Sequence, residues 1–438
     1  MNDDLQRGRP CDEDLEIILS IRKSSLVNRK FPHYICRKPL FCMKKIFFFV
    51  VFALITLFAN AQTLSTDATI SLLTVSPGAE LYSTFGHSAI RIRDPRQGLD
   101  FTFNYGAFDF RTKGFYIKFL RGTLPYQISG NYFENDVAGW SQENRSVIEQ
   151  VLNLSQAQKQ GVYDFLQNNY LPQNREYAYK FFYDNCSTRL RDVLRRVCKD
   201  SLQLSKTLHA DSSYRQWIDL YARKNEKLWA DFGMDLAIGE PSDEITGANG
   251  AMFLPDNLMD AFDAAKINRD GKWQPLVLSK QLINRDMLAV ADKEKETITP
   301  NILFWTLFVL VLGFTAYQFK NESKSFLFDK ILFTVAGIFG WFIFLLWFFT
   351  DHGVTENNLN IIWTYPLLFP IALLLKKETK RAWLSKHFLA YGIILVFFLA
   401  AWKFFPQEIN YALIPVVLML CVRAFFVWWR IRKKLTSF

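Results

Sequence analysis

Five apolar runs after Pro300 are the feature that most constrains this chain. They cover about residues 302–319, 326–350, 359–375, 388–405 and 410–429. A helix needs roughly 20 apolar residues to cross a hydrocarbon core, and each run is near that length, although the third and fourth are short. We therefore expect residues 301–438 to form an all-α bundle of five transmembrane helices.

Basic residues beside these runs predict their orientation. Lys320 and Lys324 follow the first run, "KKETKR" follows the third and "RIRKK" follows the fifth. The segments after the second and fourth runs, "TDHGVTENN" and "PQEIN", contain neither Lys nor Arg. Because basic loops remain in the cytoplasm, we expect a multi-pass membrane protein with a cytoplasmic C-terminus and an exported N-terminal domain.

The formal charge of +10 does not point to nucleic acid. Lys and Arg gather beside apolar runs and do not form one basic stripe, so no nucleic-acid partner is expected. The composition, 50% hydrophobic with 42 Phe, agrees with a membrane protein.

A secretory signal is expected at residues 43–61, "MKKIFFFVVFALITLFANA", with cleavage after Ala61. Two lysines, an apolar core and a small-residue end form its three parts, and an uncleaved first anchor is the alternative. Because such signals work at an N-terminus, we interpret residues 1–42 as an over-extended gene model, disordered and outside the fold. The residue directly after the cleavage point is Gln62 and not a cysteine, so we do not expect the protein itself to be a lipoprotein.

Residues 62–300 are predicted to form an exported α+β domain. The strands "ISLLTV", "SAIRIRD" and "DFTFNYG" come first, separated by turn residues. Helices follow, one beginning after Ser155 as N-cap and one at "CSTRLRDVLRRVC", whose Leu and Val spacing predicts one buried face. The region 240–300 is expected to consist of loops and short helices.

Two cysteines of this domain lie on the second helix. Cys186 and Cys198 are twelve residues apart, about 18 Å along a continuous helix, which is too far for a disulfide. Cys198 is interpreted as a small buried residue, and Cys421 as a packing residue within a span.

Cys186 is the candidate nucleophile because it opens the helix. Asp184 or Asn185 is the expected N-cap, and the positive end of the helix dipole favours the reactive thiolate. N–H groups of the following residues, Ser187 first among them, are candidates to stabilise an oxyanion.

A cysteine nucleophile needs a base, and His87 in "YSTFGHSAIRIRD" is the leading candidate. It stands at the start of an alternating strand, where Gly86 permits close approach. A lone histidine on a strand is more often structural, but paired with Cys186 it can accept and return the thiol proton. Asn104, on the polar face of the next strand, is our choice for the group that orients it.

These residues carry a resemblance. A histidine on an early strand followed much later by Asn-Cys at a helix start resembles the circularly permuted papain-like group of the NlpC/P60 superfamily, including its lecithin-retinol acyltransferase branch. More closely, "STFGHSAIRI", "FNYGAFDF" and "YDNCSTRL", joined to a C-terminal membrane bundle, resemble the Bacteroidota family with an Lnb-type periplasmic domain. The likeness covers about residues 65–430.

The resemblance implies a lipoprotein N-acyltransferase of the bacterial inner membrane, with residues 62–300 as a periplasmic catalytic domain and the C-terminus in the cytoplasm. Cys186 would take an acyl chain from a membrane phospholipid as a thioester, with help from His87. It would then pass the chain to the α-amino group of a diacylglyceryl-cysteine lipoprotein. This chemistry requires no metal, ATP or cofactor, and its partners are the two lipid substrates.

One outward loop and two rival functions complete the expectations. Asp351 and His352 in "TDHGVTENN" most simply belong to a solvated loop, and our hypothesis for them is that they help to seat a lipid headgroup. The main rival function is a cell-wall peptidase or amidase, because the same Cys–His chemistry cuts peptide bonds. The second rival function is that of a non-enzymatic membrane sensor. Five spans favour a lipid substrate, since a soluble substrate would require only one anchor.

Overall fold

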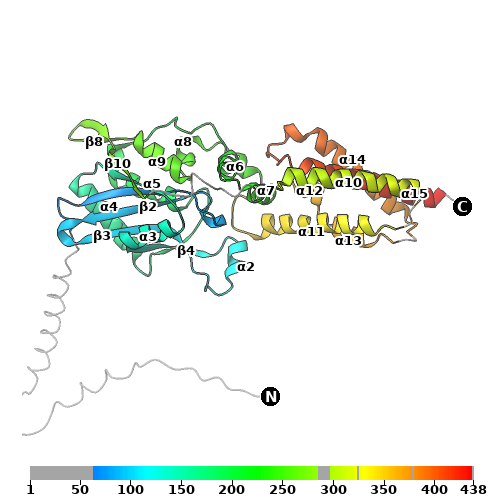
Figure 1. The fold of residues 1–438 in the computed structure, drawn as a ribbon, viewed down its shortest axis with the longest axis horizontal. Helices are drawn as coiled ribbons and strands as arrows, with labels where there is room; N and C mark the ends of the chain where they lie inside the picture. Colours follow the sequence, from blue (N-terminus) through cyan, green and yellow to red (C-terminus); the bar gives the residue numbers. More distant parts are fainter. Residues whose placement is uncertain (1–62, 285–295, 323–324, 377–378, 437–438) are drawn as a thin grey trace, which may run out of the picture. The chain divides into compact units, whose positions relative to one another are not determined.

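The computed structural model describes residues 63–284, 296–322, 325–376 and 379–436. The over-extended start predicted for residues 1–42 and the signal peptide predicted for residues 43–61 lie outside these described residues. Within them, a mixed domain of strands and helices is followed in sequence by a helical region (Figure 1).

A seven-stranded sheet in the order β10-β5-β1-β2-β3-β4-β6 forms the frame of the first domain. All neighbouring strands pair antiparallel. Its strands are β1 (Thr69–Val75), β2 (His87–Asp94), β3 (Leu99–Ala107), β4 (Pro125–Tyr132), β5 (Val147–Leu152), β6 (Glu176–Ala178) and β10 (Val277–Asn284). The three strands predicted from sequence are β1, β2 and β3. Most side chains of β1 and β2 are buried, as expected where both faces of a sheet are covered.

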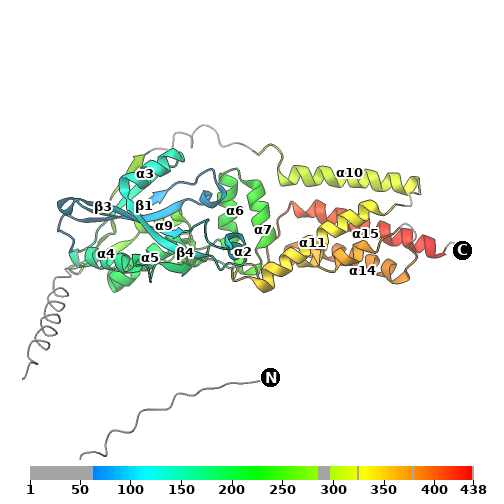
Figure 2. The same cartoon turned by 90° about the horizontal axis from the view of Figure 1, so that it is seen from below.

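Two helices pack side by side against this sheet (Figures 1 and 2). The first, α4 (Gln156–Tyr170), begins as predicted after Ser155, whose hydroxyl accepts the N–H of Gln158 in a capping box. The second, α5 (Cys186–Cys198), is amphipathic and buries its Leu and Val face in the main core. This packing sets the N-terminal end of α5 against β2 and β3.

The remaining helices of the domain are shorter. They are α2 (Phe115–Leu120), α3 (Phe133–Gln142), α6 (Tyr214–Lys224), α7 (Leu228–Ala237), α8 (Gly247–Ala251) and α9 (Pro255–Asp263).

Residues 240–300 contain strands that the sequence analysis missed. A small second sheet joins β7 (Leu202–Gln203), β8 (Lys266–Arg269) and β9 (Lys272–Pro275), and β10 adds to the edge of the main sheet beside β5. Most of β10 is exposed. An exposed edge strand does not need an apolar face, so its sequence lacks the alternation that reveals a strand.

In the part of the chain that the structure describes, four helices are long and apolar enough to cross a membrane. They are α10 (Pro300–Lys320), α11 (Leu327–Phe349), α14 (Ala382–Ala400) and α15 (Leu413–Thr436). The third predicted span is instead broken into α12 (Ile361–Thr364) and α13 (Leu368–Leu373). Pro366 explains the break, because proline lacks an N–H and disfavours helical geometry at the residue before it. The expected count of five continuous helices is therefore not confirmed.

Two glycines of α11 accommodate the broken segment. A Cβ added at Gly340 would overlap the carbonyl group of Thr364, and one at Gly337 would overlap the backbone of Phe369. Small residues of this kind let backbones approach closely within a membrane. The backbone of the α12–α13 segment is therefore packed directly on α11.

A buried arginine joins three of the long helices. Arg423 of α15 donates from Nε to Asp329 of α11 at 2.7 Å, and its other nitrogens donate to Thr315 and Gln318 of α10 at 2.9 and 2.8 Å. Neither Arg423 nor Asp329 is exposed. A charge buried among apolar helices needs such partners, so this group helps to set which helices are neighbours.

We predict that Gly340→Ala destabilises the protein, because the added methyl group meets packed backbone that cannot move aside. Overpacking of this kind costs about 1–3 kcal/mol. Gly313→Ala in α10 is the matched control, since a Cβ there meets no atom within 4 Å. Thermal unfolding in detergent should show a lower midpoint for Gly340→Ala and an unchanged or higher one for Gly313→Ala. Equal midpoints for the two variants would contradict the packing.

Candidate functional site

Asn185 fixes the helix start on which Cys186 stands. Its Oδ1 accepts the N–H groups of Ser187 and Thr188, both at 2.9 Å. Its Nδ2 donates to the carbonyl groups of Phe181 and Phe253, both at 2.8 Å. The predicted N-cap is therefore confirmed for Asn185, and Cys186 is the first residue of α5.

His87 meets Cys186 from the first position of β2. The imidazole lies close enough for its charge to act on the thiol, and the backbone N–H of Ser88 also lies near the sulfur. On its other side, Nε2 of His87 lies 3.0 Å from Oδ1 of Asn104 on β3. Because Nε2 faces Asn104, Nδ1 is the ring nitrogen that can exchange a proton with the Cys186 thiol. The structure thus brings together Cys186, His87 and Asn104 as the sequence predicted.

The electrostatics of this pair favour an ionised thiol. Burial alone would raise the pKa of the Cys186 thiol, but the charge of His87 and the hydrogen bonds from His87, Ser88 and Ser187 hold it below its usual value. Burial alone would likewise lower the pKa of His87, but Cys186 and Asn104 hold it above its usual value. Both shifts stabilise a thiolate–imidazolium pair.

Cys198 shows the opposite behaviour at the other end of the same helix. Burial raises the pKa of its thiol to about 11. Both cysteines are free in the structure, as predicted from their spacing. Local surroundings therefore lower the pKa of one thiol and raise that of the other on the same helix.

Asp136 extends the group and was missed by the sequence analysis. One carboxylate oxygen of Asp136, on α3, accepts Nδ2 of Asn104 at 2.8 Å, and the other accepts Nδ2 of Asn131 at 2.9 Å. This contact holds the Asn104 amide with its oxygen toward His87. No spacing pattern links Asp136 to the other residues, because it comes from a separate helix.

Two residues proposed as cap or oxyanion donors have other roles. Asp184 is not the cap, because its carboxylate pairs with Arg189 at 2.6 and 2.7 Å. The N–H of Ser187 is bound by Asn185, and its hydroxyl lies 2.9 Å from that of Ser88. Neither group is thus available to an oxyanion. The capping bond that forms the helix start also occupies the N–H groups that follow the cysteine.

Asp351 and His352 lie against the end of α2. The N–H of Asp351 donates to the carbonyl of Arg121 at 2.8 Å, and Nε2 of His352 lies 3.0 Å from the carbonyl of Leu120. Burial lowers the pKa of His352, so the neutral ring can donate this bond. Both carbonyls belong to the helix end, where backbone acceptors lack intrahelical partners. The two residues tie α2 to the loop after α11, and their headgroup role stays a prediction.

We predict that Cys186 is alkylated at neutral pH at least about tenfold faster than an ordinary thiol, because its lowered pKa leaves more of it as thiolate. His87→Ala should raise the pKa of Cys186 and slow its alkylation at pH 7, and the difference should narrow above pH 9. Cys198 should stay unmodified and serves as the internal control. The alkylation rates are measured by mass spectrometry of the iodoacetamide-labelled peptides. If Cys186 is alkylated at the same rate in His87→Ala and in wild-type protein at pH 7, the pairing is wrong.

Family models match the two halves of the chain. The Lnb N-terminal periplasmic domain matches residues 58–220, which contain Cys186, His87, Asn104 and Asp136. The Lnb transmembrane domain matches residues 292–435, which contain the long apolar helices. No curated protein and no solved structure matches the chain. The order of the two matched domains, with the cysteine site in the first, identifies the chain as a member of the Lnb family of membrane proteins with a periplasmic domain.

Proposed function

We propose that this protein is a lipoprotein N-acyltransferase of the bacterial inner membrane, with its first domain in the periplasm and its C-terminus in the cytoplasm. The observation that carries the proposal is the Cys186–His87–Asn104 group in a chain whose described residues also include four long apolar helices. Membership of the Lnb family agrees with a role in lipoprotein processing. We further propose that the domain is a circularly permuted papain-like fold, in which the base strand precedes the nucleophile helix.

In the first half-reaction, the Cys186 thiolate attacks an ester carbonyl of a phospholipid. The carbonyl oxygen becomes an oxyanion, and the N–H of Cys186 itself is our candidate donor, since Asn185 occupies the next two. The C–O ester bond then breaks. His87 gives its proton to the departing alkoxide, so a lysophospholipid leaves and a thioester remains on Cys186.

In the second half-reaction, the free α-amino group of a diacylglyceryl-cysteine lipoprotein attacks the thioester carbonyl. Neutral His87 accepts the proton that the amine loses. The C–S bond breaks, the amide product leaves, and Cys186 is again a thiolate beside a protonated His87. Asn104 holds the ring in place through both steps, and Asp136 holds Asn104.

Helix α2 supports a lipid substrate over a soluble peptide. Tyr116 and Ile117 are 77% and 67% exposed, and Phe119 and Leu120 are also exposed. A short helix that presents aromatic and aliphatic side chains is suited to the interfacial region of a bilayer. Its end is bonded to the loop after α11, a membrane-length helix. A cell-wall peptidase would have no use for such a surface.

We predict that Cys186→Ala abolishes acyl transfer, by at least about a thousandfold, because the nucleophile is lost. Cys198→Ala is the matched control and should remain active. Mass spectrometry of wild-type protein with phospholipid should find an acyl mass on the Cys186 peptide that hydroxylamine removes.

Mass spectrometry of cellular lipoproteins tests the reaction itself. Cells without this protein, and without any redundant enzyme, should accumulate diacylated lipoproteins with a free α-amino group. Persistently triacylated N-termini in that strain would exclude the acyltransferase. Altered cell-wall peptides in the same strain would favour the peptidase.

We predict that Ile117→Asp combined with Phe119→Asp lowers transfer from phospholipid vesicles on the order of tenfold, because two exposed apolar side chains that would enter the bilayer become charged. Iodoacetamide labelling of Cys186 should be unchanged, since α2 does not belong to the Cys–His pair. Leu278→Asp on β10 is the control, because Leu278 is 64% exposed and lies on another element. If the control variant loses as much activity as the α2 variant, the lipid role of α2 is wrong.

A further inference from the structure

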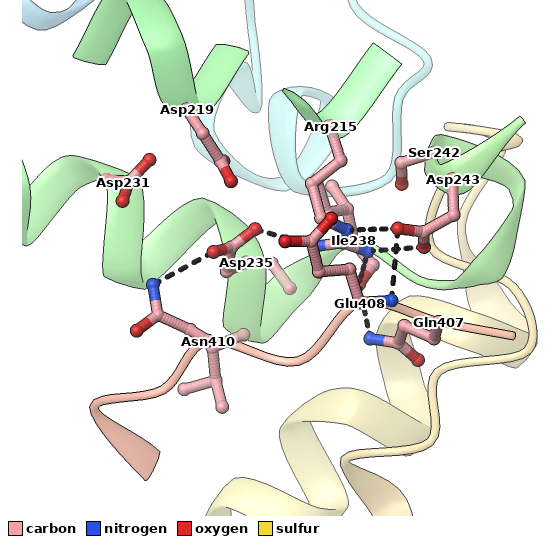
Figure 3. A network of polar contacts seen from close by, with 12 residues as sticks. Arg215, Asp219, Asp231, Asp235, Ile238, Ser242, Asp243, Gln407, Glu408 and Asn410 are labelled. Carbon is pink, nitrogen blue, oxygen red and sulfur yellow. Dashed lines mark hydrogen bonds and ion pairs between the residues drawn. The ribbon is translucent and has the colours of Figure 1, made fainter. Parts of the chain in front are cut away.

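Three buried aspartates face one another between α6 and α7. Asp219 comes from α6, and Asp231 and Asp235 come from successive turns of α7. Each offers a carboxylate oxygen, and these oxygens lie within 4.8 Å of one another. Figure 3 shows the cluster beside Arg215. All three residues are at least 95% buried.

The charges around this cluster do not balance. Arg215 is fully buried and pairs with Asp235 at 2.6 Å and with Asp243 at 2.9 Å. Arg223 is largely exposed and reaches Asp219 at 3.2 Å, with Asp231 farther off at 3.9 Å. Two arginines thus face four aspartates. If all four are ionised, two negative charges remain uncompensated in a buried place, where an unpaired charge is costly.

Two carboxylate oxygens in the cluster also lack partners. In the described part of the chain, Oδ1 of Asp219 and Oδ1 of Asp231 are buried and have no hydrogen-bond partner. Buried polar atoms are nearly always bonded, so two facing carboxylates without a donor need either a proton shared between them or a bound cation. This observation is separate from the clustering of the acids. Both unpartnered atoms are carboxylate oxygens, which are acceptors and can bind a cation.

We propose that Asp219, Asp231 and Asp235 bind one divalent cation of the Ca²⁺ class. Hard cations prefer oxygen ligands, and Ca²⁺ takes them at about 2.3–2.6 Å, so two ligands of one ion can lie up to about 5 Å apart. The oxygens of the cluster meet this limit. A charge of +2 cancels the excess, and the ion supplies the partner that the two orphaned oxygens lack. The site is distinct from the Cys186 group and takes no part in acyl transfer.

The chain offers one alternative to a metal, which is a shared proton. Burial and the neighbouring carboxylates raise the pKa of Asp219 to about 9 and that of Asp231 to about 6. A protonated Asp219 could then donate to Asp231. The two possibilities differ in what they predict: a proton-sharing pair ignores Ca²⁺ and tolerates amide replacements, whereas a metal site does neither.

The position of the cluster gives the ion a structural role. Asp235 also accepts Nδ2 of Asn410 at 2.9 Å, just before α15. Nearby, the Asn358 amide donates to the carbonyl groups of Leu236 and Ala237 at the end of α7, and Gln407 donates to that of Ile238. Figure 3 shows Gln407, Glu408 and Asn410 around this end of α7. An ion at the cluster would therefore stiffen the helix pair to which the segments before α12 and α15 are bonded.

The experiment uses the full chain in detergent, treated with EDTA and then titrated with CaCl₂. We expect the apparent melting temperature to rise by about 5 °C at saturating Ca²⁺, because a ligand that binds only the folded state stabilises it. Asp219→Asn combined with Asp231→Asn should abolish this rise. Asp192→Asn is the matched control, since it makes the same change at an exposed residue outside the cluster, and it should keep the full response.

A direct binding measurement keeps the test decisive if the double variant does not fold. Equilibrium dialysis of wild-type protein against ⁴⁵Ca²⁺ should find one ion per chain. Binding of less than about a tenth of an ion, or an unchanged melting temperature in wild-type protein, would overturn the proposal. A double variant that is as stable as EDTA-treated wild-type protein and still responds to Ca²⁺ would also overturn it.

Discussion

The amide of Asn185 is the interaction on which the arrangement of the first domain's site depends. One buried side chain makes four hydrogen bonds, two from the first turn of α5 and two to carbonyl groups of Phe181 and Phe253. It therefore joins the loop before the helix, the helix start and a segment almost seventy residues later. Cys186 is the next residue, so the position of its sulfur is set by an amide with no bonding capacity to spare.

The other polar side chains of the site also have bonding partners on both sides. His87 has one nitrogen toward Asn104 and one toward Cys186, and Asn104 in turn is held by Asp136. Each member is oriented by a group on a different element, β2, β3 or α3, so the sheet and α3 must all be in place before the pair is formed. A site built in this way is preorganised, which is what stabilising a charged pair in a half-buried place requires.

Cys186, His87 and Asn104, which the structure brings together, were all predictable from sequence, because each sits at a recognisable local position. Cys186 opens an amphipathic helix, His87 opens a strand, and Asn104 lies on the polar face of the next strand. Asp136 was not predictable, because only the tertiary fold brings α3 to Asn104. The expected oxyanion donors failed for a local reason, since a cap that satisfies two N–H groups removes them from catalysis.

The limits of prediction were similar in the other regions. Edge strand β10 was not predicted because its side chains are mostly exposed and show no alternation of apolar and polar residues. The broken third span was visible in principle, since Pro366 and Pro370 stand within it, but the length of the apolar run dominated the interpretation. The aspartate cluster gave no signal because its members are spread over two helices. Sequence patterns describe single helices and strands well. These features depend on two or more helices or strands that only the fold brings together.

The break between α12 and α13 also bears on how the protein enters its membrane. Backbone groups freed at the break near Tyr365 and Pro366 cannot face lipid alone, because hydrocarbon offers no hydrogen-bond partner. The segment packs its backbone on Gly337 and Gly340 of α11. The broken segment would therefore have to meet α11 before its freed backbone groups left water.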